Sequence, residues 1–318
     1  MDSHAAEVGP RAGGSQWAGT PERGHSLVVR SGVWLALRMG RPLSLRLLHL
    51  VAAYYFLFAP SAARAARDYL PRVLGRPARA RDRYRQIYYF AVSLLDRLYL
   101  LKGRQLFDVS VEGVPLMLET LRRGKGAFLL GSHLGSFALV GSVGQRRPDL
   151  KVAMAMYEAQ AGPLSNLFRI IQGEEAPEII PLGHLEAMLR IRDRLDEGKF
   201  VGMLADRTII EAPAQLVSFL GRPALFPSGP MRVAAALRRP VIFMTGLYRG
   251  GNRYHVVFHP LADFSQPSAT GRDAAVRAAI ADYARLLERY TRSDPYNWFN
   301  FYDFWHGAPT RGDSGPPP

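Results

Sequence analysis

Short apolar segments that alternate with segments of helical spacing constrain the fold of this chain more than any other feature. Each apolar segment is too short for a buried helix and is typical of a buried strand. We expect strands at residues 109–113, 126–131, 151–156, 178–181, 200–205, 215–220, 241–248 and 254–259. The helical spacing predicts helices at residues 84–101, 135–145, 162–172, 185–197, 229–237 and 272–292. This alternation predicts an α/β fold with a largely parallel central sheet flanked by helices.

Composition divides the chain into four parts. Residues 1–26 are rich in Gly, Ser, Ala and Pro, and their apolar residues have no regular helical or strand-like spacing. This composition predicts a disordered leader. Residues 27–102 combine an apolar segment with a basic cluster and predict an N-terminal membrane-associating helical region. The α/β pattern then occupies residues 103–306, and residues 307–318 predict a disordered tail.

The apolar segment near the N-terminus is short for a membrane span. Residues 47–59 carry no formal charge, but they are fewer than the ~20 apolar residues that a spanning helix needs. Counting from Pro42 and letting Arg46 snorkel gives a marginal span, while an interfacial or re-entrant hairpin fits equally well. A basic cluster follows, consisting of Arg64, Arg67, Arg72, Arg76, Arg79, Arg81, Arg83 and Arg85. This order is typical of anchoring to anionic membrane lipids, although an arginine-rich solvated helix face is the alternative.

The net charge points to an anionic partner. Lys and Arg number 41 against 27 Asp and Glu, which gives a formal net charge of +14. Such a surface favours an acidic protein, an anionic membrane or nucleic acid. No recognition motif accompanies the arginines and they follow an apolar segment, so we expect no nucleic acid partner.

Several kinds of chemistry are excluded by residue type or spacing. The chain has no cysteine, which excludes disulfides and thiolate nucleophiles. The histidines His255 and His259 are four residues apart, but they fall in the predicted strand at 254–259 rather than in a helix, so we expect neither a metal nor another cofactor. A serine hydrolase is disfavoured because no Gly-x-Ser-x-Gly motif surrounds Ser132, Ser136 or Ser142.

The sequence "GSHLGSF" places one histidine directly after a predicted strand. In an open α/β sheet, functional groups gather where the parallel strands end, and His133 follows the strand at 126–131. Gly131 and Gly135 allow the backbone to approach a ligand, and a helix predicted to begin at Gly135 would favour an uncharged imidazole and bind negative charge. His133 is therefore a candidate general base, with a polar turn residue as the alternative.

Three other segments carry candidate site residues. "GMLADR" at 202–207 is a strand that ends in Asp206 and Arg207. "FLGRPALFPSGP" at 219–230 contains Arg222, and its Ser228 and Gly229 would cap the next helix and offer amides to an anion. The aromatic segment at 294–305 fits either a plug in the core or a belt at a membrane interface.

The order of these segments resembles the bacterial lipid A biosynthesis acyltransferases, the lauroyl and myristoyl transferases of the lysophospholipid acyltransferase superfamily. The resemblance runs from about Gly32 to Trp305. It depends on the N-terminal apolar element followed by "RDYLPRVLGR", then "GSHLGSF", "GMLADR", "FLGRPALFPSGP" and "DPYNWFNFYDFW". None of these motifs is specific alone, and their combination in this order is what indicates the family.

The resemblance implies a membrane-associated enzyme that moves an acyl group from an acyl thioester to a hydroxyl of a lipid or glycolipid acceptor. The donor would be acyl carrier protein or acyl-CoA, and the location the cytoplasmic face of a bacterial inner membrane. His133 would be the base, and the Gly135 amide or Arg207 could stabilise the oxyanion. The expected substrate-binding residues are Gly135, Ser136, Arg207, Arg222, Ser228 and Gly229.

The chain departs from the family at one position. The family motif has Glu or Asp five residues after the histidine, where this chain has Ala138. Another acid could replace the missing carboxylate, and Asp206 and Glu158 are the best placed because both follow predicted strands. Alternatively, the protein is a weakly active or non-catalytic lipid-binding relative, or the alanine is an introduced substitution.

Overall fold

A computed structural model gives the fold of the chain. It describes residues 25–101, 106–137, 139–141, 150–157, 178–208, 213–266 and 271–305. Ala138, Glu158 and the helix predicted at 162–172 lie outside the described residues, as do residues 1–24 and 306–318.

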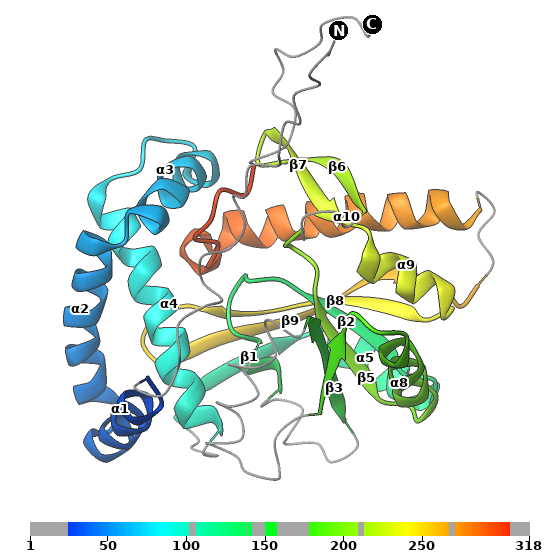
Figure 1. The fold of residues 1–318 in the computed structure, drawn as a ribbon, viewed down its shortest axis with the longest axis horizontal. Helices are drawn as coiled ribbons and strands as arrows, with labels where there is room; N and C mark the ends of the chain where they lie inside the picture. The colour runs from blue at the N-terminus through cyan, green and yellow to red at the C-terminus, as the bar shows by residue number, and fades with distance from the viewer. Residues whose placement is uncertain are drawn as a thin grey trace, which may run out of the picture.

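The described residues form a seven-stranded sheet, which confirms the predicted α/β class (Figure 1). Its strands are β1 Asp108–Glu112, β2 Ala127–Gly131, β3 Val152–Tyr157, β4 Ile179–Leu182, β5 Phe200–Leu204, β8 Pro240–Tyr248 and β9 Arg253–Asp263. Their order across the sheet is β1-β9-β8-β2-β5-β3-β4. The strands from β8 to β4 run parallel, whereas β9 is antiparallel to β8 and β1 runs parallel to β9. The carboxyl ends of β2 and β5 therefore meet at one edge.

The strand predicted at 215–220 belongs to a separate hairpin. β6 Ala214–Phe219 pairs antiparallel with β7 Arg222–Pro227 and with no strand of the large sheet among the described residues. Leu220 and Gly221 form the two-residue turn with φ of 49° and 80°, and positive φ at both central positions is what such a tight hairpin requires. β7 was not predicted as a strand because it begins and ends beside prolines, which are uncommon in central strands.

The sheet is covered by helices on both faces. Alternate residues of β2 point to opposite faces and pack in two different apolar clusters. Phe128 and Leu130 pack in the same cluster as Tyr283 of α10 Arg272–Ser293. Ala127 and Leu129 pack in a second cluster with helical residues of α4 and α5. β2 is fully buried, so it is a continuous apolar run rather than an alternating one. The described part of this region also contains α5 Val114–Arg122, α8 Leu185–Asp196, α9 Gly229–Ala236 and the short η2 Pro295–Asn297.

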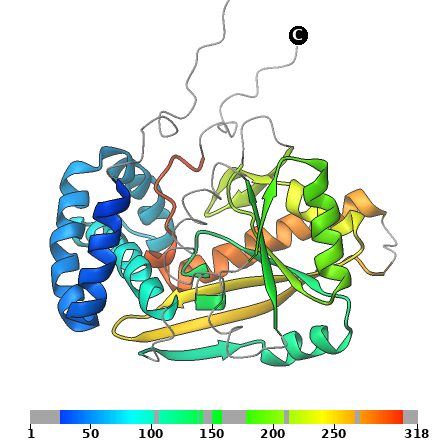
Figure 2. The same ribbon diagram turned by 60° about the horizontal axis from the view of Figure 1, so that its bottom comes forward.

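The N-terminal residues form a helical lobe beside the sheet, and α4 is the helix of this lobe nearest the strands (Figures 1 and 2). It consists of α1 His25–Met39, α2 Arg41–Phe58, α3 Pro60–Leu74 and α4 Ala80–Leu101. Arg41 at the start of α2 links this helix to α4, because its Nε and Nη2 lie 2.7 and 2.8 Å from the carboxylate oxygens of Asp96 on α4. Tyr254 of β9 donates to the same carboxylate at 2.7 Å. The lobe is thus tied to the sheet through a buried ion pair.

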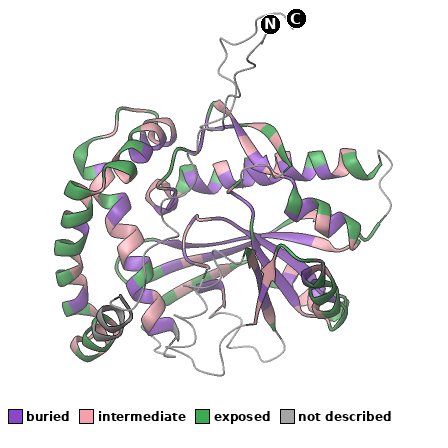
Figure 3. Ribbon diagram, in the orientation of Figure 1, coloured by how far each residue is buried: buried purple, intermediate pink, exposed green. Residues whose placement is uncertain are grey.

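The outward side of α2 is exposed (Figure 3) and carries several apolar residues. Its exposed side chains include Leu50, Tyr54, Leu57 and Phe58, each more than half exposed. Within the described residues, no single helix has both the length and the hydropathy to cross a membrane. α2 and α3 reach that threshold only as a pair, with a bend of 88° between them.

Candidate active site

The neighbouring strands β2 and β5 bring His133 and Asp206 together. Gly131 at the end of β2 pairs with Leu204 at the end of β5, and each candidate residue follows its strand by two positions. The Nδ1 of His133 lies 2.8 Å from Oδ1 of Asp206, and the His133 backbone N–H donates to Oδ2 at 2.9 Å. The carboxylate therefore fixes both the backbone and the ring of the histidine. A proton on Nδ1 leaves the other ring nitrogen, Nε2, as the basic atom.

Asp206 is an ionised carboxylate inside the protein, with a side chain only 1% exposed. Burial raises the pKa of Asp206, but the charge of His133 and the two hydrogen bonds from His133 more than offset it, so this pKa lies below its ordinary value. The indole Nε1–H of Trp298 also donates to Oδ2, at 3.2 Å. Asp206 thus carries its negative charge at neutral pH and can stabilise an imidazolium.

Residues 297–299 run alongside the histidine loop and hold it from the opposite side. The Phe299 N–H donates to the carbonyl oxygen of His133 at 2.8 Å, and Leu134 forms an antiparallel bridge with Trp298. Trp298 is completely buried and its ring packs against Tyr69 and Phe219. For Trp298, the structure therefore selects the core plug over the membrane-interface belt.

The amides expected to bind an oxyanion are already engaged. The Gly135 N–H donates to the carbonyl oxygen of Asn297 at 2.8 Å, and the Ser136 N–H donates to that of Gly246 at 2.7 Å. Gly135 has φ of 76°, and a Cβ there would lie 2.2 Å from the Gly246 oxygen. The glycine is required for close packing against β8, and the proposed oxyanion role of its amide was wrong.

A cavity of about 690 Å³ lies in front of the histidine. Its walls combine the polar loop around His133 with apolar side chains such as Met154, Met203 and Val233. That volume is within the ~300–1,000 Å³ typical of ligand sites, and the mixture of an apolar wall with a few polar groups is typical as well. The dyad therefore faces a space that can hold an apolar ligand.

A family model of the bacterial lipid A biosynthesis acyltransferases matches residues 20–306. The chain belongs to this family. No curated protein matches the chain. Membership implies an acyltransferase that acts on lipid A or related lipids, and such enzymes are typically associated with membranes. Within the described residues, no cluster of three or more His, Asp or Glu could hold a metal ion.

The expected substrate-binding residues of this acyltransferase divide between several places. Gly135, Ser136, Arg207 and Gly229 line the cavity in front of His133. Arg222 instead lines a second cavity beside the helical lobe, with its guanidinium 3.7 Å from Asp68.

Ser228 has a structural role that the sequence did not indicate. Its hydroxyl and its N–H both donate to the carbonyl oxygen of Pro213, at 3.0 and 2.9 Å. The hydroxyl does not cap α9, although Ser228 occupies the N-cap position. The expectation that Ser228 offers a free amide to an anion was therefore wrong.

Arg207 is the candidate cation nearest to the dyad in sequence and lines the same cavity. Its guanidinium lies over the ring of Tyr302, 5.2 Å from the centroid. Its buried Nε has no hydrogen-bond partner among the described residues. A buried N–H without a partner is costly, so this side chain is suited to an anionic or carbonyl oxygen of a ligand.

Arg97 of α4 was missed by the sequence analysis. It lines both the cavity in front of His133 and the second cavity beside the helical lobe. Burial lowers the pKa of Arg97 to about 10, so the guanidinium remains charged at neutral pH. The available signal was the adjacent charged pair Asp96 and Arg97 within the otherwise apolar end of a predicted helix.

Proposed function

We propose that this protein transfers an acyl group from acyl carrier protein or acyl-CoA to a hydroxyl of a lipid or glycolipid acceptor, at the cytoplasmic face of the inner membrane. The observation that carries the proposal is the 2.8 Å contact of the buried Asp206 carboxylate with Nδ1 of His133, which lines a mainly apolar cavity. This arrangement is that of a general base with its orienting acid.

The reaction proceeds by direct attack, since the chain has no cysteine to form a thioester of its own. Nε2 of His133 removes the proton of the acceptor hydroxyl as its oxygen attacks the thioester carbonyl carbon. The tetrahedral intermediate then collapses, the carbon–sulfur bond breaks, and the imidazolium returns the proton to the leaving thiolate. Asp206 stabilises the imidazolium between these two proton transfers.

Asp206 takes the role of the carboxylate that is missing at Ala138. A histidine offers Nδ1 to one carboxylate, and here that atom already lies 2.8 Å from Asp206. Ala138→Glu should therefore bring no increase in activity. A large increase in this variant would show instead that the dyad with Asp206 is incomplete.

Arg207 is the proposed oxyanion group, because its side chain lines the cavity and its Nε has no hydrogen-bond partner within the part of the chain that the structure describes. A charged donor in a buried site stabilises the negative oxygen that develops on the thioester carbonyl. The excess of 41 Lys and Arg over 27 Asp and Glu supports the choice of partners, since acyl carrier proteins are acidic and the inner leaflet is anionic.

The deciding experiment is transfer of a radiolabelled acyl chain from acyl carrier protein into a lipid fraction. His133→Ala should reduce the rate by about 10²–10⁴-fold, the contribution typical of a general base. His259→Ala is the matched control, because His259 lies outside the cavity in front of His133, and it should retain full activity. If wild-type protein folds and binds lipid but transfers no acyl chain from either donor, the protein is the non-catalytic lipid-binding relative instead.

A further inference from the structure

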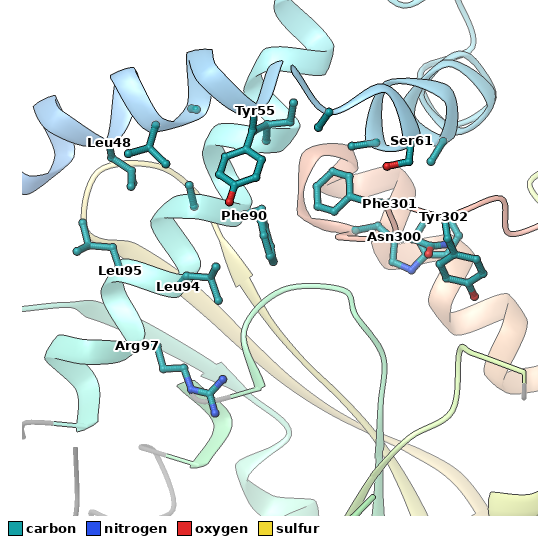
Figure 4. Close-up of a pocket in the computed structure, with 18 of the residues that line it drawn as sticks. Leu48, Tyr55, Ser61, Phe90, Leu94, Leu95, Arg97, Asn300, Phe301 and Tyr302 are labelled. Atoms are coloured by element: carbon teal, nitrogen blue, oxygen red, sulfur yellow. The ribbon is translucent and has the colours of Figure 1, made fainter. Parts of the chain in front are cut away.

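The second cavity lies between the helical lobe and the aromatic segment that follows α10, and it has a volume of about 1460 Å³ (Figure 4). All four helices of the lobe contribute to its wall, together with residues 298 and 300–305. The side chains around it are mainly apolar and include Leu48, Tyr55, Phe90, Leu95 and Phe301. We call it the lobe cavity.

The lobe cavity adjoins the cavity in front of His133. Phe90, Leu94, Arg97 and Phe301 line both of them. A ligand in the lobe cavity can therefore place one end beside these four residues, which also border the cavity of the histidine.

The lobe cavity also borders the apolar outer side of α2. Tyr54 and Tyr55 are adjacent on this helix and are exposed to a similar degree, 59% and 54%. Tyr55 lines the cavity, where Figure 4 draws its ring on the side of Phe90, whereas Tyr54 is not part of the wall. Successive residues of a helix point about 100° apart. The exposed side chains of Leu47, Val51 and Tyr55 are therefore also part of the cavity wall.

Size distinguishes the two cavities. At about 1460 Å³ the lobe cavity exceeds the ~300–1,000 Å³ of ordinary ligand sites, whereas the cavity in front of His133 falls within that range. The larger space suits a lipid with more than one chain, and the smaller one suits a single chain.

The charged residues of the lobe cavity are mostly basic. Arg64, Arg97 and Arg222 line it, against the acids Asp68 and Asp303. Asp68 is 3.7 Å from Arg222 and also pairs with Arg72 at 2.6 Å. Arg97 lines both cavities, where an anionic head group would meet a half-buried guanidinium.

We propose that the lobe cavity holds the hydrocarbon chains of the lipid acceptor, which enters from the bilayer past α2 and places its anionic head at Arg97. This inference rests on the proposed function and assigns the acceptor to one of the two cavities. The donor is attached to a water-soluble carrier and needs room for one acyl chain, so it takes the cavity in front of His133. The acceptor hydroxyl and the thioester then meet at the histidine.

The test uses fluorescence quenching by a lipid with brominated chains, which quench tryptophan on contact. Trp298 and Trp305 line the lobe cavity, and in the full chain carrying Trp17→Phe and Trp34→Phe they are the two remaining tryptophans. Dibrominated phosphatidic acid in detergent micelles should quench this emission. Tyr55→Asp should weaken the apparent affinity at least tenfold, because it places a charge in the wall, and the matched Tyr54→Asp should change it less than twofold.

The outcomes separate this inference from the proposed function. His133→Ala should leave quenching unchanged, because lipid binding does not require the base, so an inactive protein that still shows Tyr55-dependent quenching supports the inference. Equal effects of Tyr54→Asp and Tyr55→Asp would overturn it. So would stronger quenching by acyl carrier protein that bears a brominated acyl chain, since the lobe cavity would then belong to the donor. Circular dichroism of each variant verifies folding.

Discussion

Two buried aspartates in different regions of the molecule have carboxyl pKa values that are shifted in opposite directions. Asp206 at the sheet edge faces a histidine, and the pKa of its carboxyl is lowered in spite of burial. Asp96 in the helical lobe faces Arg41 and Tyr254, yet burial outweighs both partners and raises its pKa. In the proposed mechanism the first carboxylate supports a proton transfer, whereas the second joins two helices and a strand. The two aspartates are of the same residue type and are both buried, and they differ in the partner at the carboxylate.

Replacement of Asp206 should give the largest effect. Asp206→Asn keeps the shape of the side chain but removes the charge that stabilises the imidazolium and selects its tautomer. We expect turnover to fall by about 10⁴-fold, the loss found when the equivalent acid of a catalytic triad is neutralised. The measurement is initial-rate acyl transfer, with the exposed Asp193→Asn on α8 as the control. A variant that retains more than a tenth of wild-type turnover would remove Asp206 from the mechanism.

Breaking the ion pair between Arg41 and Asp96 in the helical lobe should reduce the stability of the protein rather than its turnover. Arg41→Met leaves the Asp96 side chain, which is 1% exposed, without its cation, and removing one partner of a buried pair costs about 3–5 kcal/mol. Denaturant unfolding measures this loss in the free energy of unfolding. Arg123→Met, which removes the exposed pair with Glu119, should cost less than about 1 kcal/mol. Similar costs for the two variants would mean that the lobe is not held by Arg41.

Replacement of Asp82 should give the smallest change in the free energy of unfolding, and this change should depend most strongly on pH. Its carboxylate accepts hydrogen bonds from Arg76, the Arg79 N–H and Tyr296, and the hydrogen bond from Arg76 is the main reason that its pKa lies well below its ordinary value. Asp82→Asn should therefore cost about 1–3 kcal/mol at neutral pH.

The sign of the pH dependence follows from the lowered pKa of Asp82. A carboxyl that is more acidic in the folded state stabilises that state above the unfolded pKa of ~3.9, and the stabilisation is lost as pH falls. The difference in unfolding free energy between wild type and Asp82→Asn should be constant from pH 6 to 8 and shrink below about pH 4. A difference that grows on acidification would contradict the assignment.

The alternation of apolar and helical segments was sufficient to predict the sheet, because buried parallel strands must be short apolar runs. Asp206 could be named as a candidate for the same reason, since it follows a predicted strand. Its contact with His133 could not be derived, because β5 lies beside β2 although β3 and β4 come between them in the chain. The engagement of the Gly135 amide also depends on a distant residue, Asn297. Long-range pairing of this kind leaves no local pattern in the sequence.

The hydrogen bonds that residues 297–299 make to the histidine loop and to Asp206 determine when the site can form during synthesis. Translation runs from the N-terminus, so the apolar lobe leaves the ribosome first and can reach a membrane while the sheet is still incomplete. Trp298 and Phe299 emerge near the end, and only then do Asp206 and His133 gain their last partners. Under the proposed function, a nascent chain would therefore reach the lipid surface before it is competent to modify a lipid.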